Sequence, residues 1–100
     1  MTPKAVQIAG VKYQIVESKD LMIDSEVYGQ VTYHNNRILI DGSLEVQRKE
    51  SVFVHEMFHA IMFEAGYDEQ DEDMVRRVSN VLYQVLKDNN FEFEADTAEG

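Results

Sequence analysis

The sequence predicts an α+β domain in which a small antiparallel sheet of about three strands packs on two antiparallel helices. In the first half of the chain, apolar residues alternate and an Asn-rich turn interrupts them, a pattern that is typical of strands and a hairpin. In the second half, two long segments carry apolar residues at helical spacing. Gly66 lies between these segments and leaves only a short connection, so the helices should be antiparallel neighbours.

Strands are expected in two regions of the chain. The segment Val11–Val16 alternates between apolar and polar residues and predicts one strand. Residues 29–33 and 37–40 predict the two strands of a hairpin. Because Asn tolerates a positive φ, Asn35 and Asn36 suit a tight two-residue turn between these strands.

The two helices have recognisable ends. The first is predicted from about residue 44 to residue 65, with Ser43 as its N-cap and Gly66 as its C-cap. The second is predicted over about residues 71–88, where carboxylates in the first turn oppose the positive end of the helix dipole. Its apolar stripe should pack against the first helix and comprises Val75, Val78, Leu82, Val85 and Leu86.

The remaining segments are less regular. Residues 20–24 fit either a helical turn or a loop with apolar anchors, and residues 91–94 fit a short extended segment. Residues 95–100 have the composition of a frayed tail. We therefore expect a single domain over residues 1–90, followed by a C-terminal tail over residues 91–100.

Charge and composition exclude several classes of protein. The net charge of −10 argues against a nucleic-acid-binding surface, which needs clustered Lys and Arg, and against attraction to an anionic membrane. The chain has no Cys, so disulfides and Cys-ligated zinc are excluded. No signal-peptide core and no long apolar run is present, and we expect a cytoplasmic protein. The sequence does not indicate an oligomeric state.

The first predicted helix carries the pattern His55-Glu56-x-x-His59. Two His residues four positions apart lie on one face of a helix, so both imidazoles can reach one Zn²⁺ ion. Glu56 projects beside the same face, where a carboxylate can act as the general base of a metalloprotease. The neighbouring residues are apolar nearly all round the helix, and ionisable groups in such surroundings are costly unless they are bound or paired. These neighbours are Val52, Phe53, Val54, Met57, Phe58, Ile61, Met62 and Phe63.

A catalytic zinc needs a third protein ligand. Without Cys, the candidates are His34 in the hairpin turn and the carboxylates at the start of the second helix. Helical geometry favours Glu72 at the edge of the apolar stripe, followed by Asp71 and then Asp73. Asn80 lies on an adjoining face and fits either an outer partner of the ligands or a surface amide.

Several segments around this motif resemble small phage and mobile-element proteins that are grouped with the ImmA/IrrE-type metallopeptidases, the zincin-like H-E-x-x-H proteins. The similar segments are residues 54–61, 64–67, 71–75 and 82–89, and the hairpin at residues 29–41 fits as well. The motif is specific, whereas the rest is a loose pattern of residue types over residues 29–90.

The resemblance implies a minimal zincin-like fold with a zinc cofactor and a third ligand on the second helix. It supports Glu72, because Asp71-Glu72-x-x-Val75 is similar to the acidic start of this helix in the family. The chain departs from larger members at Arg76, where those often carry a Glu four residues before an Asn.

Together, the residues predict a zinc-dependent metallopeptidase that hydrolyses a protein or peptide substrate. His55, His59 and Glu72 would hold the zinc, and Glu56 would be the catalytic base. The substrate that the resemblance suggests is a phage or mobile-element regulator. The main alternative is a non-catalytic, metal-stabilised binding or adaptor protein, since bound metal stabilises a small fold; a metal-free phage structural protein is a third interpretation.

Overall fold

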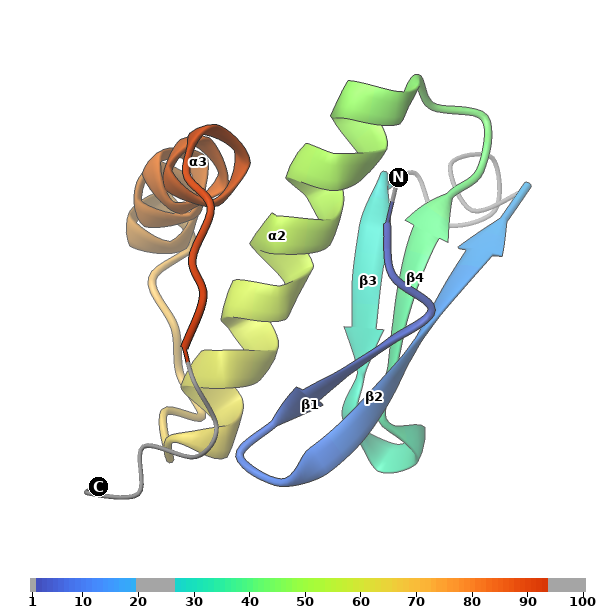
Figure 1. Ribbon diagram of the computed structural model, residues 1–100. Helices are drawn as coiled ribbons and strands as arrows, with labels where there is room; N and C mark the ends of the chain where they lie inside the picture. Colours follow the sequence, from blue (N-terminus) through green and yellow to red (C-terminus); the bar gives the residue numbers. More distant parts are fainter. Residues whose placement is uncertain (1, 20–26, 94–100) are drawn as a thin grey trace.

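The structure, a computed structural model, describes residues 2–19 and 27–93. Four strands form one sheet, and one long helix lies against one face of it, with a second helix on the far side of the first (Figure 1). The elements are β1 (Ala5–Ile8), β2 (Val11–Ser18), β3 (Gly29–Thr32), the 3-10 turn η1 (Tyr33–Asn35), β4 (Arg37–Asp41), α2 (Val46–Glu64) and α3 (Glu72–Asp88). The predicted α+β class is confirmed.

The sheet has one strand more than predicted and is mixed rather than purely antiparallel. Its order is β1-β2-β4-β3. Strands β1 and β2 pair antiparallel, as do β3 and β4, whereas β2 and β4 pair parallel with Ile15 opposite Ile38. The parallel pair joins two hairpins into one sheet, and β3 forms the edge that runs beside α2.

The strand that the sequence analysis missed is β1, which forms a tight hairpin with β2. The two turn residues, Ala9 and Gly10, have φ values of 53° and 82°. A two-residue turn with positive φ at both positions matches the twist of the strands it joins, but it is usually marked by Asn-Gly or Asp-Gly. Ala rarely adopts this conformation because its Cβ is crowded there, so the turn carries no clear sequence signal.

The second hairpin exists, but its turn differs from the prediction. Instead of a two-residue Asn35-Asn36 turn, residues 33–35 form a 3-10 turn, and Asn36 follows with φ 54° and ψ 58°. Val31 lies opposite Ile38, and Thr32 lies opposite Arg37. The single residue with positive φ is an Asn, which tolerates the left-handed conformation better than most residues.

The core lies between the inner face of the sheet and α2. Tyr13, Ile38 and Ile40 are fully buried there, and Phe53, Val54 and Ala60 of α2 pack against them. The hydroxyl of the buried Tyr13 donates to Glu64 at the end of α2, at 2.6 Å. Gly29 of β3 permits a close approach of sheet and helix, because a Cβ at this position would lie 2.5 Å from Val52 Cγ1.

Helix α2 begins later than predicted, and its end agrees with the prediction. Ser43 is not the N-cap: its amide and hydroxyl donate to Asp41, and the helix begins at Val46 after Glu45. At the other end, Gly66 has φ 104°, with its amide bonded to Phe63 O and the Tyr67 amide bonded to Met62 O. This pair of hydrogen bonds is a Schellman motif, so Gly66 ends the helix as expected.

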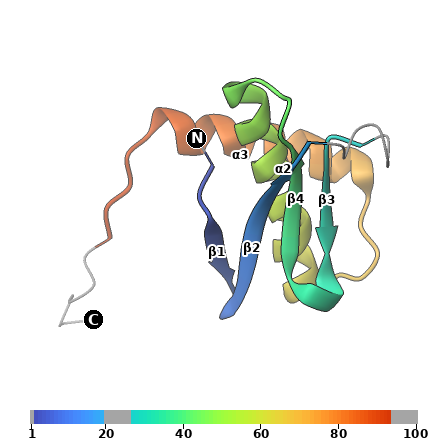
Figure 2. The same cartoon turned by 90° about the vertical axis from the view of Figure 1, so that its right-hand side faces the viewer.

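Helix α3 begins and ends within a residue of the predicted bounds, and Asp71 caps it by accepting from the Asp73 amide. It runs in the opposite sense to α2 along their contact, since Glu72 lies near His55 whereas the later Tyr83 lies near Glu50. The two helices nevertheless cross steeply. Helix α3 is seen nearly end-on in Figure 1 and lies across the view in Figure 2. Val75 is fully buried on the inner side of α3.

Two further predictions concern the irregular segments. Residues 20–24 lie outside the described part of the chain, as do residues 94–100 of the predicted tail. Residues 91–93 have no regular secondary structure.

Of the helices in the described ranges, none combines the length and the apolar character needed to cross a membrane.

The β1–β2 turn generates a stability prediction. Ala9→Gly should raise the free energy of unfolding by up to about 1 kcal/mol, because glycine adopts positive φ without steric cost. The same change at Ala5, within β1, should lower it by roughly 0.5–1 kcal/mol, since glycine weakens an extended strand. Urea denaturation of both variants measures these changes in the free energy of unfolding. A loss of stability in Ala9→Gly would contradict the turn geometry.

Candidate metal centre

Helix α2 places His55 and His59 side by side on one face. Their ring centroids are 5.0 Å apart and the ring planes meet at 70°. The two side chains are 24% and 17% exposed, so each ring is partly enclosed and still reachable from solvent. The separation of one helical turn therefore produces the paired imidazoles that the motif predicts.

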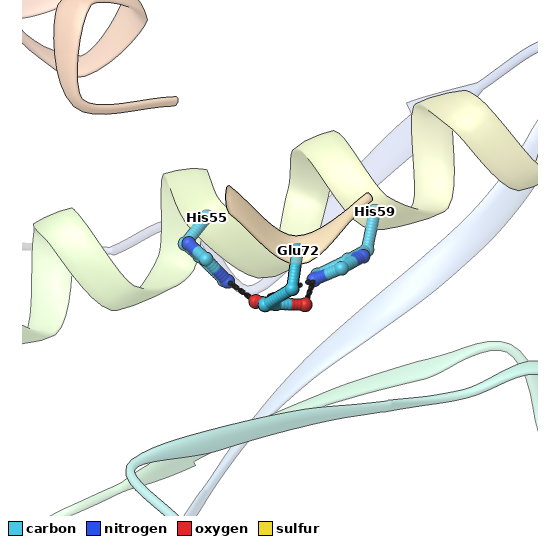
Figure 3. A group of neighbouring side chains, drawn as sticks. All are labelled: His55, His59 and Glu72. Atoms are coloured by element: carbon cyan, nitrogen blue, oxygen red, sulfur yellow. Dashed lines mark hydrogen bonds and ion pairs between the residues drawn. The ribbon is translucent and has the colours of Figure 1, made fainter. Parts of the chain in front are cut away.

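Glu72, in the first turn of α3, lies between the two imidazoles (Figure 3). Its Oε2 is 2.9 Å from His55 Nε2, and its Oε1 is 3.1 Å from His59 Nε2. The three ligand atoms lie within 4.8 Å of one another and form the only such His/carboxylate group in the described residues. The structure thus brings together the three residues that the sequence analysis ranked first.

The donor set and its spacing fit a zinc ion. A tetrahedral ion with bonds of about 2.0–2.2 Å needs donor atoms roughly 3.4 Å apart. The imidazole–carboxylate separations here are 2.9, 3.1 and 3.4 Å. Two imidazoles and one carboxylate are also a known ligand set for catalytic zinc, which keeps a fourth position for water. Glu72 is 67% exposed, so that side of the group is open to solvent.

Gln70, in the connection between the helices, holds the His59 ring. Its side-chain amide donates to the backbone carbonyls of His59 and Tyr67, at 3.3 and 3.1 Å. Because carbonyls only accept hydrogen bonds, the amide oxygen must face the ring, where it lies 2.6 Å from His59 Nδ1. That nitrogen then carries a proton, so Nε2, which faces Glu72, is the nitrogen that holds the lone pair in the neutral ring.

Ser79, on α3, contacts the ring of His55 at the corresponding nitrogen, Nδ1. Its hydroxyl oxygen lies 3.2 Å from His55 Nδ1 and 3.3 Å from the carbonyl of Arg76. When the hydroxyl donates to that carbonyl, it accepts from Nδ1–H, and Nε2 is then the nitrogen that holds the lone pair in the neutral ring. Ser79 is 2% exposed, so its orientation is constrained by packing. Gln70 and Ser79 therefore orient both rings with Nε2 toward Glu72, which is the orientation that two imidazole ligands of one cation need.

Glu56 follows His55 and lines the same pocket as the three candidate ligands. Burial raises its pKa from 4.5 to about 7; the charge of Glu72 adds to the rise and that of His59 opposes it. A carboxyl group whose pKa lies near neutrality can both accept and release a proton at physiological pH. The side chain packs against β3, because a Cβ on Gly29 would lie 3.0 Å from Glu56 Cγ.

The pocket is an open groove of about 640 Å³. Its walls come from α2, from the first turns of α3 and from the edge strand β3 with the residues just before it. Val31 and Val52 supply apolar surface beside the metal ligands, and Tyr28 lies on the outer rim, 46% exposed. The candidate ligands thus line an open groove on the surface of the domain.

The other predicted candidates have different places. Asp71 caps α3, and Asp73 pairs with Arg76 and Arg77, so neither lies between the imidazoles. His34 is exposed in the turn at the far end of the hairpin and is outside the group. Asn80 lines the pocket with an exposed side chain.

Gln70 and Ser79 were not predicted from the sequence as partners of the candidate ligands. Ser79 had a signal, because it lies two turns after Glu72 on the same helical face. Gln70 had none, because its contacts follow from the path of the connection between the helices. Comparison of the chain with protein-family models, with curated proteins and with solved structures finds no match.

The geometry predicts one Zn²⁺ per chain and a graded response to substitution. His59→Ala should abolish tight binding, and Glu72→Ala should weaken it strongly, because each removes a ligand. Gln70→Ala and Ser79→Ala should weaken it by roughly 10–100-fold, the usual effect of losing a partner that orients a ligand.

Competition with a zinc chelator measures all four variants. Asp73→Ala is the matched control, since it changes a carboxylate in the same helical turn that faces away from the group. Zinc binding of the Glu72→Ala variant equal to that of Asp73→Ala would rule out Glu72 as a ligand.

The raised pKa of Glu56 predicts a pH dependence in chelator-treated protein. Because the folded-state pKa of about 7 exceeds the unfolded value of 4.5, the folded protein binds more protons between these pH values. Stability should therefore fall as pH rises through this window, by at most about 3 kcal/mol. Glu56→Gln should remove this fall, because the amide does not ionise. Urea denaturation of both proteins at pH values from 4.5 to 8 tests this prediction. The same dependence of the free energy of unfolding on pH in both proteins would contradict the buried environment of Glu56.

Proposed function

We propose that the protein is a zinc-dependent metallopeptidase of minimal zincin-like type, which hydrolyses peptide bonds of a protein or peptide substrate. The observation that carries the proposal is the placement of Glu56 in the same groove as the group formed by His55, His59 and Glu72. A purely structural zinc site is closed and needs no base, whereas this one has an exposed side and a carboxyl group beside it.

Each residue has a distinct task in this mechanism. Bound zinc would supply Lewis acidity toward water and toward the carbonyl oxygen of the scissile bond. Glu56 accepts the proton of the attacking water and then releases it to the departing amine nitrogen, which balances the hydrolysis. Gln70 and Ser79 keep the imidazole rings oriented with Nε2 toward the centre.

The position of the edge strand β3 favours a peptide as the substrate. It lines the groove, and within the described part of the chain it pairs with β4 only, so its other edge has unpaired backbone groups. An extended peptide can add to such an edge through main-chain hydrogen bonds. This placement would hold a peptide bond alongside α2 without requiring a particular side chain. By resemblance to the ImmA/IrrE-type proteins, the substrate would be a phage or mobile-element regulator.

A second candidate function is a metal-stabilised binding protein without catalysis. It is favoured by the position of the ligands, because Glu72 of α3 and the two imidazoles of α2 would be joined through one ion. Such a cross-link would stabilise a small domain by holding its outer helix in place. In this case Glu56 would have no role beyond lining the groove.

The substitution Glu56→Gln separates the two candidates. The zinc-loaded wild-type protein should cleave members of a mixed peptide library, detected as new termini by mass spectrometry, and a chelator should stop the cleavage. Glu56→Gln should retain the zinc and the fold but lose at least about 100-fold in rate, the scale of a lost general base. Equal cleavage by both proteins would remove Glu56 from the mechanism, and no cleavage by zinc-loaded wild type would favour the binding protein.

A further inference from the structure

Arg48 lies in the groove of the candidate metal centre, at some distance from the ligands. It is seven residues before His55 on α2, so the two share one face of the helix, about 10 Å apart along its axis. Its side chain is exposed. The groove therefore has two chemically different regions: the metal-binding group with Glu56, and a cationic region at the N-terminal part of α2.

Arg48 differs from the other cationic side chains of the two helices. Lys49 pairs with Glu17, Lys87 pairs with Glu50, and both arginines of α3 pair with Asp73. Among the described residues Arg48 has no hydrogen-bond or ion-pair partner, although the chain carries a net charge of −10. An arginine left unpaired in such an acidic chain, inside a groove, is available to an external anion.

The opposite wall of the groove adds polar groups to the same region. Arg76 and Asn80 of α3 line the groove together with Arg48. Asn80 is one turn before Tyr83, whose hydroxyl contacts the carbonyl of Gln47 and the carboxylate of Glu50. Through these contacts the later turns of α3 lie near the first turns of α2, where Arg48 lies.

We propose that Arg48, with Arg76 and Asn80 lining the same groove, binds a carboxylate of the substrate; this inference rests on the proposed peptidase function. The guanidinium group offers a planar pair of donors that matches a carboxylate. An extended peptide advances about 3.3 Å per residue, so the carboxylate lies about three or four residues from the bond that is cut. The substrate class is thus a peptide segment with an acidic side chain, or a free C-terminus, at that distance.

The test uses the zinc-loaded Glu56→Gln protein, in which binding is measured without cleavage. The probes are fluorescent, neutral, C-terminally amidated peptides in which a single Glu or Gln is moved along the sequence, and the same Gln peptides with a free C-terminus. Fluorescence anisotropy should show about tenfold tighter binding for one Glu position, the scale of a hydrogen bond between charged groups. The amidated Glu peptides and the free C-terminal peptides distinguish the two sources of carboxylate.

Substitution at Arg48 shows whether that preference comes from this residue. Arg48→Gln, in the same background, should abolish it, and Arg48→Glu should favour peptides that carry Lys at the same position. The matched control is Arg37→Gln, which makes the same charge change at an exposed arginine of β4 that is outside the groove. Equal binding of Glu and Gln peptides, including no binding of either, overturns the inference, as does a preference that persists in Arg48→Gln. Failure of the peptidase function is recognised separately: acidic peptides then bind at Arg48, but the wild-type protein cleaves none of them.

Discussion

The candidate centre depends on the connection between α2 and α3. The Schellman motif at Gly66 ends α2, and the side chain of Asp71 caps α3 a few residues later. Between them, Gln70 bonds both to the backbone of α2 and to the His59 ring. After this connection the chain passes α2 next to the two imidazoles, and Glu72 therefore lies between them.

The acidic residues that follow Gly66 have separate tasks. Asp71 accepts from the backbone at the helix start, Asp73 pairs with two arginines, and Glu72 alone faces the imidazoles. This division leaves one carboxylate for the centre, as a site with two imidazoles requires. It also limits like-charge repulsion, since the neighbouring carboxylates are neutralised or solvated.

The sheet contributes to the site through its edge. Gly29 lets β3 approach α2 closely enough that a side chain at that position would collide with Val52. The same approach shields Glu56 on the β3 side, and burial is the main cause of its raised pKa. The edge strand is thus both a wall of the groove and part of the reason why the pKa of Glu56 is raised. The position of β3 and the raised pKa of Glu56 are thus linked by one packing contact.

The sequence by itself determined the class of fold, the helix that carries His55 and His59, its end at Gly66 and the span of α3, because these follow from periodicity and capping over short distances. It also ranked Glu72 first as third ligand from helical geometry. It did not reveal β1, whose turn uses Ala9 in a conformation that its side chain disfavours. Only the tertiary structure decided the parallel pairing of β2 with β4, the steep crossing of α3, and the contacts of Gln70 and Ser79 with the rings. These features depend on how segments distant in sequence pack together, and no local pattern of residues encodes that.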